Sequence, residues 1–91
     1  MSMSGVSVAS GQSLQLEATQ ESYDRAIVTL NLVLIEDTAH EEAVRTRLFK
    51  VMDERNELGD YSTFDLHVMA KNIEGNVDQF LNELGAQKLE A

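Results

Sequence analysis

The chain has 91 residues, enough for one small domain, and its 43% apolar and 25% charged residues are ordinary for a folded protein. Sixteen acidic residues against seven basic ones give a formal net charge of −9, which argues against direct binding to nucleic acid or to an anionic membrane. There is no cysteine, so disulfides, thiolate metal sites and cysteine nucleophiles are excluded.

Other classes of protein are disfavoured by what the sequence lacks. The longest apolar run, residues 32–35, is far shorter than the roughly 20 residues of a membrane-spanning helix. Residues 1–12 have no basic residue and no apolar run of the kind found in signal peptides, so we expect a cytoplasmic protein. We find no phosphate-binding glycine loop and no catalytic triad motif, and therefore expect no enzyme, cofactor or bound metal.

The first part of the chain predicts little structure. Residues 1–12 are uncharged and rich in serine and glycine, and we interpret residues 1–18 as a flexible N-terminal tail. Val6 and Val8 alternate with serine, so a short edge strand formed on binding is an alternative. Residues 19–85 are expected to form a single helical domain, followed by a short polar tail over residues 86–91.

Residues 19–36 are predicted to be a helix, although a buried strand is an alternative because the segment contains many β-branched residues. At 100° per residue, one apolar face predominates, and it includes Tyr23, Ala26, Ile27, Leu30, Val33 and Leu34, with Leu16 in line. A second apolar stripe of Val28, Leu32 and Ile35 lies roughly opposite. A helix that is apolar on two sides is either central in a bundle or has a face left for a partner.

The second helix is marked at both ends. Thr38 and Glu41 fit a capping box, and Gly59 suits the left-handed residue that ends a helix. Glu41 and Arg45 are spaced for an ion pair one turn apart. The predicted core residues are Val44, Leu48, Val51, Met52 and Leu58.

The third helix is predicted over residues 63–84, with Ser62 or Thr63 as its cap and Gly85 as its stop. Its apolar stripe keeps its phase through Gly75, although Asn76 and Gln79 could instead cap a separate fourth helix. The stripe consists of Leu66, Met69, Ala70, Ile73, Val77, Phe80, Leu81 and Leu84.

Together these elements predict an all-α fold. The second and third helices should form an antiparallel helical hairpin, and the first helix should cover its open side to give a three-helix bundle. Because a core of this size supplies little net stability, we expect a homodimer that self-associates through Val28, Leu32 and Ile35.

Several residues lie off the predicted core and are candidates for binding a partner. Phe49, Phe64 and Val68 are apolar but fall outside the main stripes. Arg55 falls within the stripe of the second helix, where it either pairs with a carboxylate of a neighbouring helix or anchors a partner protein.

The two histidines could in principle carry chemistry. His67, with Lys71 four residues later, permits the hypothesis of a histidine phosphotransfer intermediate, although the usual lysine spacing is three. His40 lies near Asp37 and Glu41, but no second cluster completes a metal site. We interpret both as ordinary surface histidines.

The function favoured by the sequence is a non-enzymatic protein-interaction module, such as an adaptor, small chaperone or inhibitor, that acts through apolar helix faces. The alternative is an acidic inhibitor that mimics nucleic acid. Four of the seven basic residues lie in the second helix, which argues against strong mimicry.

Overall fold

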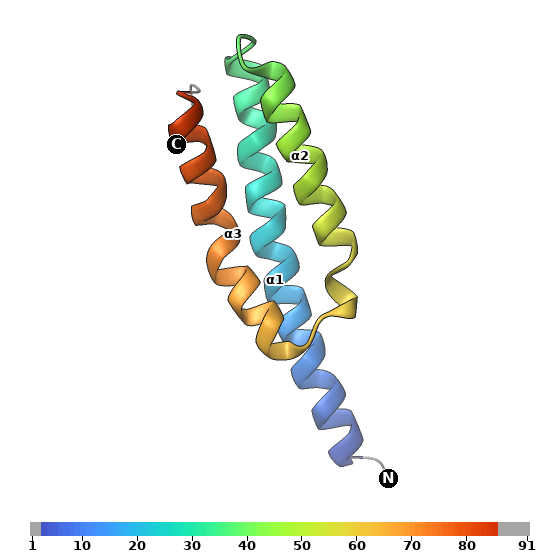
Figure 1. Ribbon diagram of the computed structural model, residues 1–91. Helices are drawn as coiled ribbons and strands as arrows, with labels where there is room; N and C mark the ends of the chain where they lie inside the picture. The colour runs from blue at the N-terminus through green and yellow to red at the C-terminus, as the bar shows by residue number, and fades with distance from the viewer. Residues whose placement is uncertain (1–2, 86–91) are drawn as a thin grey trace.

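The computed structural model of the chain describes the backbone of residues 3–85 and the side chains of residues 13–85, and the fold within this part is all-α. Its elements are α1 (Met3–Glu36), α2 (Glu41–Asn56), the short 3-10 helix η1 (Leu58–Asp60) and α3 (Thr63–Leu84). Successive α-helices run in opposite directions and form a three-helix bundle, as predicted (Figure 1). The predicted tail over residues 86–91 lies outside the described residues.

The first helix is much longer than the sequence predicted. It begins at Met3, so residues 3–18 are helical where we expected a flexible tail; the alternative strand at Val6 and Val8, which was expected to form only on binding, stays a prediction. The chain contains no proline to break this helix, and Leu16 packs against the core and anchors the segment from its C-terminal side. The division of the chain at residue 18 stays a prediction, but the helix crosses that point without a break.

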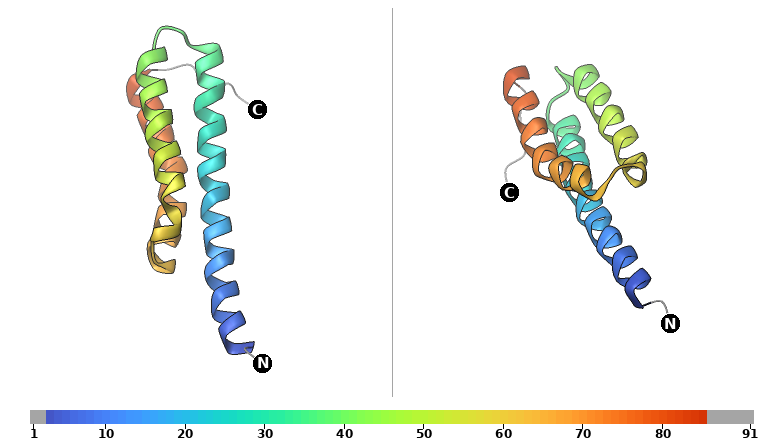
Figure 2. Two further views of the ribbon diagram at one scale, coloured as in Figure 1. Left: turned by 90° about the vertical axis from the view of Figure 1, so that its right-hand side faces the viewer. Right: turned by 60° about the horizontal axis from the view of Figure 1, so that its bottom comes forward.

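The centre of the bundle is α1, which packs along both α2 and α3, whereas α2 and α3 touch each other little. Figure 2 shows both of these helices on one side of α1, with the opposite side of α1 bare. The structure therefore does not show the predicted hairpin of α2 packed on α3. The central position of α1 agrees with the apolar residues on two sides of residues 19–36, a pattern that is typical of a central helix.

The core is built from aliphatic side chains of all three helices and η1. Leu30, Val44, Leu58 and Leu81 have no more than a trace of exposed surface. Buried apolar side chains of this kind supply most of the stabilisation of a small bundle. The complete set of buried apolar residues is Tyr23, Ala26, Leu30, Val33, Val44, Leu48, Val51, Leu58, Leu66, Ile73, Val77 and Leu81.

Met52, which we predicted to be in the core, is 41% exposed. Its position on the helix is at the edge of the α2 stripe. The error shows that the buried surface of α2 is narrower than the pattern of apolar residues suggested, because α2 packs mainly on one neighbour.

One buried polar residue joins α1 to α3. Thr19 is fully buried, and its Oγ1 lies 3.0 Å from the backbone carbonyl oxygen of Leu66 and 2.8 Å from that of Gln15. Gln15 Nε2 donates a hydrogen bond to the same hydroxyl oxygen at 3.2 Å. These contacts satisfy the hydroxyl group away from water and fix the register of the first turns of α3 against α1.

The turn between α1 and α2 differs from the predicted capping box. Asp37, not Thr38, closes it: Asp37 Oδ1 accepts a hydrogen bond from the His40 backbone N–H at 3.1 Å, and its Oδ2 lies 2.8 Å from His40 Nδ1. Because α2 begins at Glu41, Thr38 lies too far before the helix to act as its N-cap. The predicted pair of Glu41 and Arg45 is confirmed.

The ends of α3 match their predictions, whereas the end of α2 does not. Ser62 Oγ accepts a hydrogen bond from the Asp65 backbone N–H at 3.1 Å, and α3 continues through Gly75, so there is no fourth α-helix within residues 3–85. Gly85 ends α3 with a left-handed φ of 76°. Gly59 does not take a positive φ, because η1 extends the chain beyond α2 in a tighter helical turn.

Candidate interaction surfaces

The bare side of α1 is bounded by two ion pairs. Asp24 accepts hydrogen bonds from Arg55 of α2, with 2.6 Å between its Oδ1 and the arginine Nε. The next residue, Arg25, donates a hydrogen bond from its Nε to Glu74 Oε2 of α3 at 3.2 Å. Since consecutive residues point about 100° apart on a helix, these pairs mark the two edges at which α2 and α3 stop covering α1.

Between these edges lies the surface that we name the outer face of α1. Its apolar members Leu14, Val28 and Ile35 are 66%, 55% and 72% exposed, and Leu32 is half-buried. The exposed Glu21 lies among them and has no hydrogen-bond or ion-pair partner in the described part of the chain. Val28, Leu32 and Ile35 follow one another at one-turn spacing and form an apolar strip, and Leu14 lies 14 residues before Val28 on the same face, beyond Glu21.

The stripe predicted from Val28, Leu32 and Ile35 is thus on the surface, as its position opposite the core face implied. Whether it mediates self-association stays a prediction. Leu14 was not among the predicted residues of this stripe, because residues 1–18 were expected to form a tail. Its spacing of 14 and 21 residues from Val28 and Ile35, both multiples of seven, is the signal that could have found it.

The residues predicted to bind a partner are exposed but do not gather in one patch. Phe49 is 55% exposed and Phe64 is 73% exposed. Arg47, which precedes the buried Leu48, faces α3. Phe49 follows Leu48 and therefore lies on the opposite flank of α2, away from the helix that carries Phe64.

Arg55 takes the first of its two predicted roles. Its guanidinium group pairs with Asp24 of the neighbouring helix, and the side chain is 33% exposed. The pair explains how an arginine is tolerated within the apolar stripe of α2. A role of Arg55 in binding a partner stays a prediction, and the ion pair supplies no support for it.

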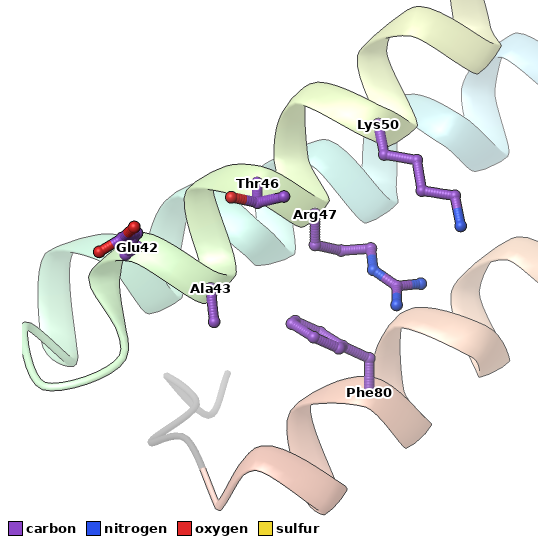
Figure 3. Close-up of a pocket in the computed structure, with 6 residues that line it drawn as sticks. All are labelled: Glu42, Ala43, Thr46, Arg47, Lys50 and Phe80. Atoms are coloured by element: carbon purple, nitrogen blue, oxygen red, sulfur yellow. The ribbon is translucent and has the colours of Figure 1, made fainter.

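Two hollows lie on the opposite side of the bundle, and residues of α2 and α3 line both of them. The first is an open hollow of about 570 Å³ in which the Arg47 guanidinium carbon lies 4.4 Å from the centre of the Phe80 ring (Figure 3). Lys50 lies on the same flank of α2, one turn beyond Arg47, and Ala43 lies one turn before it. The cation–π contact joins α2 to α3.

The second hollow is smaller, about 260 Å³, and a buried tyrosine lines it. Tyr23 is almost completely buried, and its hydroxyl group donates a hydrogen bond to Glu54 Oε1 at 3.1 Å. Burial raises the pKa of Tyr23 well above its usual range, and the adjacent negative charge of Glu54 and the hydrogen bond to it add to the effect. Val68, one of the predicted partner residues, lines this hollow together with Tyr61.

The histidines are not part of any catalytic arrangement that the structure describes. His67 is exposed on α3, and His40 pairs with the buried carboxylate of Asp37. Among residues 13–85, no three histidine, aspartate or glutamate side chains come together in a way that could hold a metal ion. Every buried side-chain polar atom described has a hydrogen-bond partner, so the interior holds no polar group waiting for a ligand.

No family model, curated protein or solved structure matches this chain. None of the helices described combines the length and apolar character needed to cross a lipid bilayer.

Proposed function

We propose that the protein is a small non-enzymatic interaction module that works by packing helix faces against other polypeptide chains. The observation that carries this proposal is the outer face of α1, where three large aliphatic side chains remain exposed after the bundle has formed its core. Removing such side chains from water contributes about 25 cal/mol per Å² of apolar surface. A second chain packed on this face would therefore add stability that the isolated bundle lacks.

The function has two components, and each uses a different surface. Val28, Leu32 and Ile35 mediate self-association into a homodimer. Phe49 and Phe64, which lie on separate flanks of the bundle, contact a different partner protein, and their large exposed rings support that role. An adaptor, a small chaperone or an inhibitor would each act in this way.

The self-association component is tested by light scattering on the purified full chain at tens of micromolar. We expect a dimer, and we expect Val28→Glu to shift it to a monomer because the new carboxylate would be buried without a partner. The matched control is Val68→Glu, the same substitution at an exposed valine of α3. A wild-type protein that is strictly monomeric would refute this component.

The partner component is tested by affinity capture from the native cell. Phe49→Ala is expected to reduce capture of a specific protein, while circular dichroism shows unchanged helix content. Unchanged capture would reject Phe49. Salt concentration separates this function from the acidic-inhibitor alternative, since binding of a nucleic-acid mimic should weaken steeply with salt, whereas apolar contacts should not.

A further inference from the structure

The outer face of α1 has the spacing of a coiled-coil seam. Residues of this face and its edges recur at alternating intervals of four and three along α1. This is the spacing of the a and d positions that meet between two supercoiled helices. The seam consists of Leu14, Ala18, Glu21, Arg25, Val28, Leu32 and Ile35, with Leu14, Glu21, Val28 and Ile35 at d and Ala18, Arg25 and Leu32 at a.

We propose that a second copy of this chain covers the seam, with the two α1 helices antiparallel and related by a twofold axis near residue 23. This inference rests on the proposed self-association and specifies its geometry. In antiparallel coiled coils each core layer pairs an a residue with a d residue. The seam then places Leu14 against Leu32 of the partner subunit and Ala18 against Val28 of the partner subunit.

The two charges of the seam select this register. At the centre, Glu21 lies against Arg25 of the partner subunit, and the twofold axis repeats the pair. A parallel dimer would instead place Glu21 against Glu21 and Arg25 against Arg25, both of which are repulsive. Shifting the antiparallel helices by one heptad would place each charge against an aliphatic residue or leave it without a partner.

The layer sizes are also complementary in this register. The small Ala18 side chain lies opposite Val28, and the exposed Leu14 lies opposite the half-buried Leu32. A layer that joins an exposed side chain to a recessed one can fill the space between the helices without forcing them apart.

The structure leaves room and hydrogen-bonding capacity for this contact. Because α2 and α3 lie on the same side of α1, the seam of each copy can approach the other without obstruction (Figure 2). Arg25 uses its Nε for Glu74 and one hydrogen of Nη2 for Ser22, which leaves other guanidinium hydrogens for Glu21 of the partner subunit.

The test uses disulfide crosslinking, for which the cysteine-free chain is well suited. Full-length Ala18→Cys and Val28→Cys variants are prepared separately with tags of different size, mixed and oxidised under mild conditions. Residues 18 and 28 of opposite subunits share a layer, so we expect the mixed disulfide to dominate. Each variant alone is the matched control, because its two cysteines would lie ten residues, or about 15 Å, apart along the helices, beyond disulfide range.

Charge reversal gives a second measurement. Glu21→Arg turns two attractive pairs per dimer into two repulsive ones and should weaken dimerisation by at least about tenfold in sedimentation equilibrium. The control is Glu57→Arg, which makes the same charge change at an exposed residue after α2. Weakening by Glu21→Arg and not by Glu57→Arg supports the proposed layer.

The outcomes separate this inference from the proposed function. A disulfide formed by Val28→Cys alone would show a parallel dimer and overturn the antiparallel register. A wild-type dimer that gives no mixed disulfide would overturn the seam but leave self-association intact. A wild-type protein that is monomeric at tens of micromolar would refute both.

Discussion

Because the hydroxyl group of Tyr23 is buried, we expect the unfolding free energy of the bundle to fall as the pH rises into the alkaline range. The hydroxyl donates to Glu54 at 3.1 Å, and the ring is 2% exposed, so Tyr23→Phe removes one hydrogen bond and leaves the packing unchanged. Because Glu54 is only partly buried, water can solvate its carboxylate in the variant. We therefore expect the variant to lose about 1 kcal/mol of unfolding free energy at pH 7.

The order of stability should reverse at high pH. The folded protein holds the pKa of Tyr23 above its unfolded value of about 10, so the unfolded chain loses this proton first. The stabilisation is fully present below about pH 10 and is lost as pH rises towards the folded pKa, by up to about 1.4 kcal/mol per pH unit. The initial advantage of wild type, about 1 kcal/mol, is then lost by about pH 11.

The assay is urea denaturation of wild type and Tyr23→Phe, followed by circular dichroism, at intervals from pH 7 to pH 12. Lysines and Tyr61 are present in both proteins, so the difference between the two curves isolates Tyr23. Curves that stay parallel through this range would refute the argument that the folded state keeps this phenol protonated.

Further substitutions test the core, the glycines and the turn by thermal or urea unfolding. Leu30→Ala should cost about 2–5 kcal/mol, since Leu30 is completely buried, and a smaller loss would contradict its central position. Gly75→Ala should stabilise α3 by about 0.5–1 kcal/mol because an added Cβ meets no atom within 4 Å, whereas Gly85→Ala should destabilise because its φ is 76°. Asp37→Ala should cost about 1–3 kcal/mol because it removes the hydrogen bonds of this buried carboxylate to His40, and Thr38→Ala should cost close to nothing; the reverse order would support the predicted capping box.

Local signals in the sequence predicted most of the secondary structure. The stripe that keeps its phase through Gly75 and the serine before it located α3 from Thr63 to Leu84. The start of α1 was missed because serine and glycine are weak helix formers. The low helix propensity of these residues is overcome because the helix is already held in place at its next turns by the packing of Leu16 and the hydrogen bonds of Thr19.

The arrangement of the helices could not be predicted in the same way. An amphipathic pattern shows which face is buried, but not which neighbour buries it. Arg55 illustrates this limit: the sequence placed it within an apolar stripe, and only the position of Asp24 on α1 decided between an ion pair and a partner anchor. The exposure of Val28 and Ile35 could be predicted because their stripe lies opposite a stripe that contains more apolar residues.

The position of α1 as the shared neighbour of α2 and α3 also determines how the bundle can open. Since these two helices contact each other little, either can detach while the other remains packed, as a separate subglobal unfolding event. Loss of α1 leaves neither of them a partner, so its buried amides exchange with solvent only in global unfolding. Hydrogen exchange should therefore be slowest in the middle of α1, and α2 and α3 should have independent, lower opening free energies.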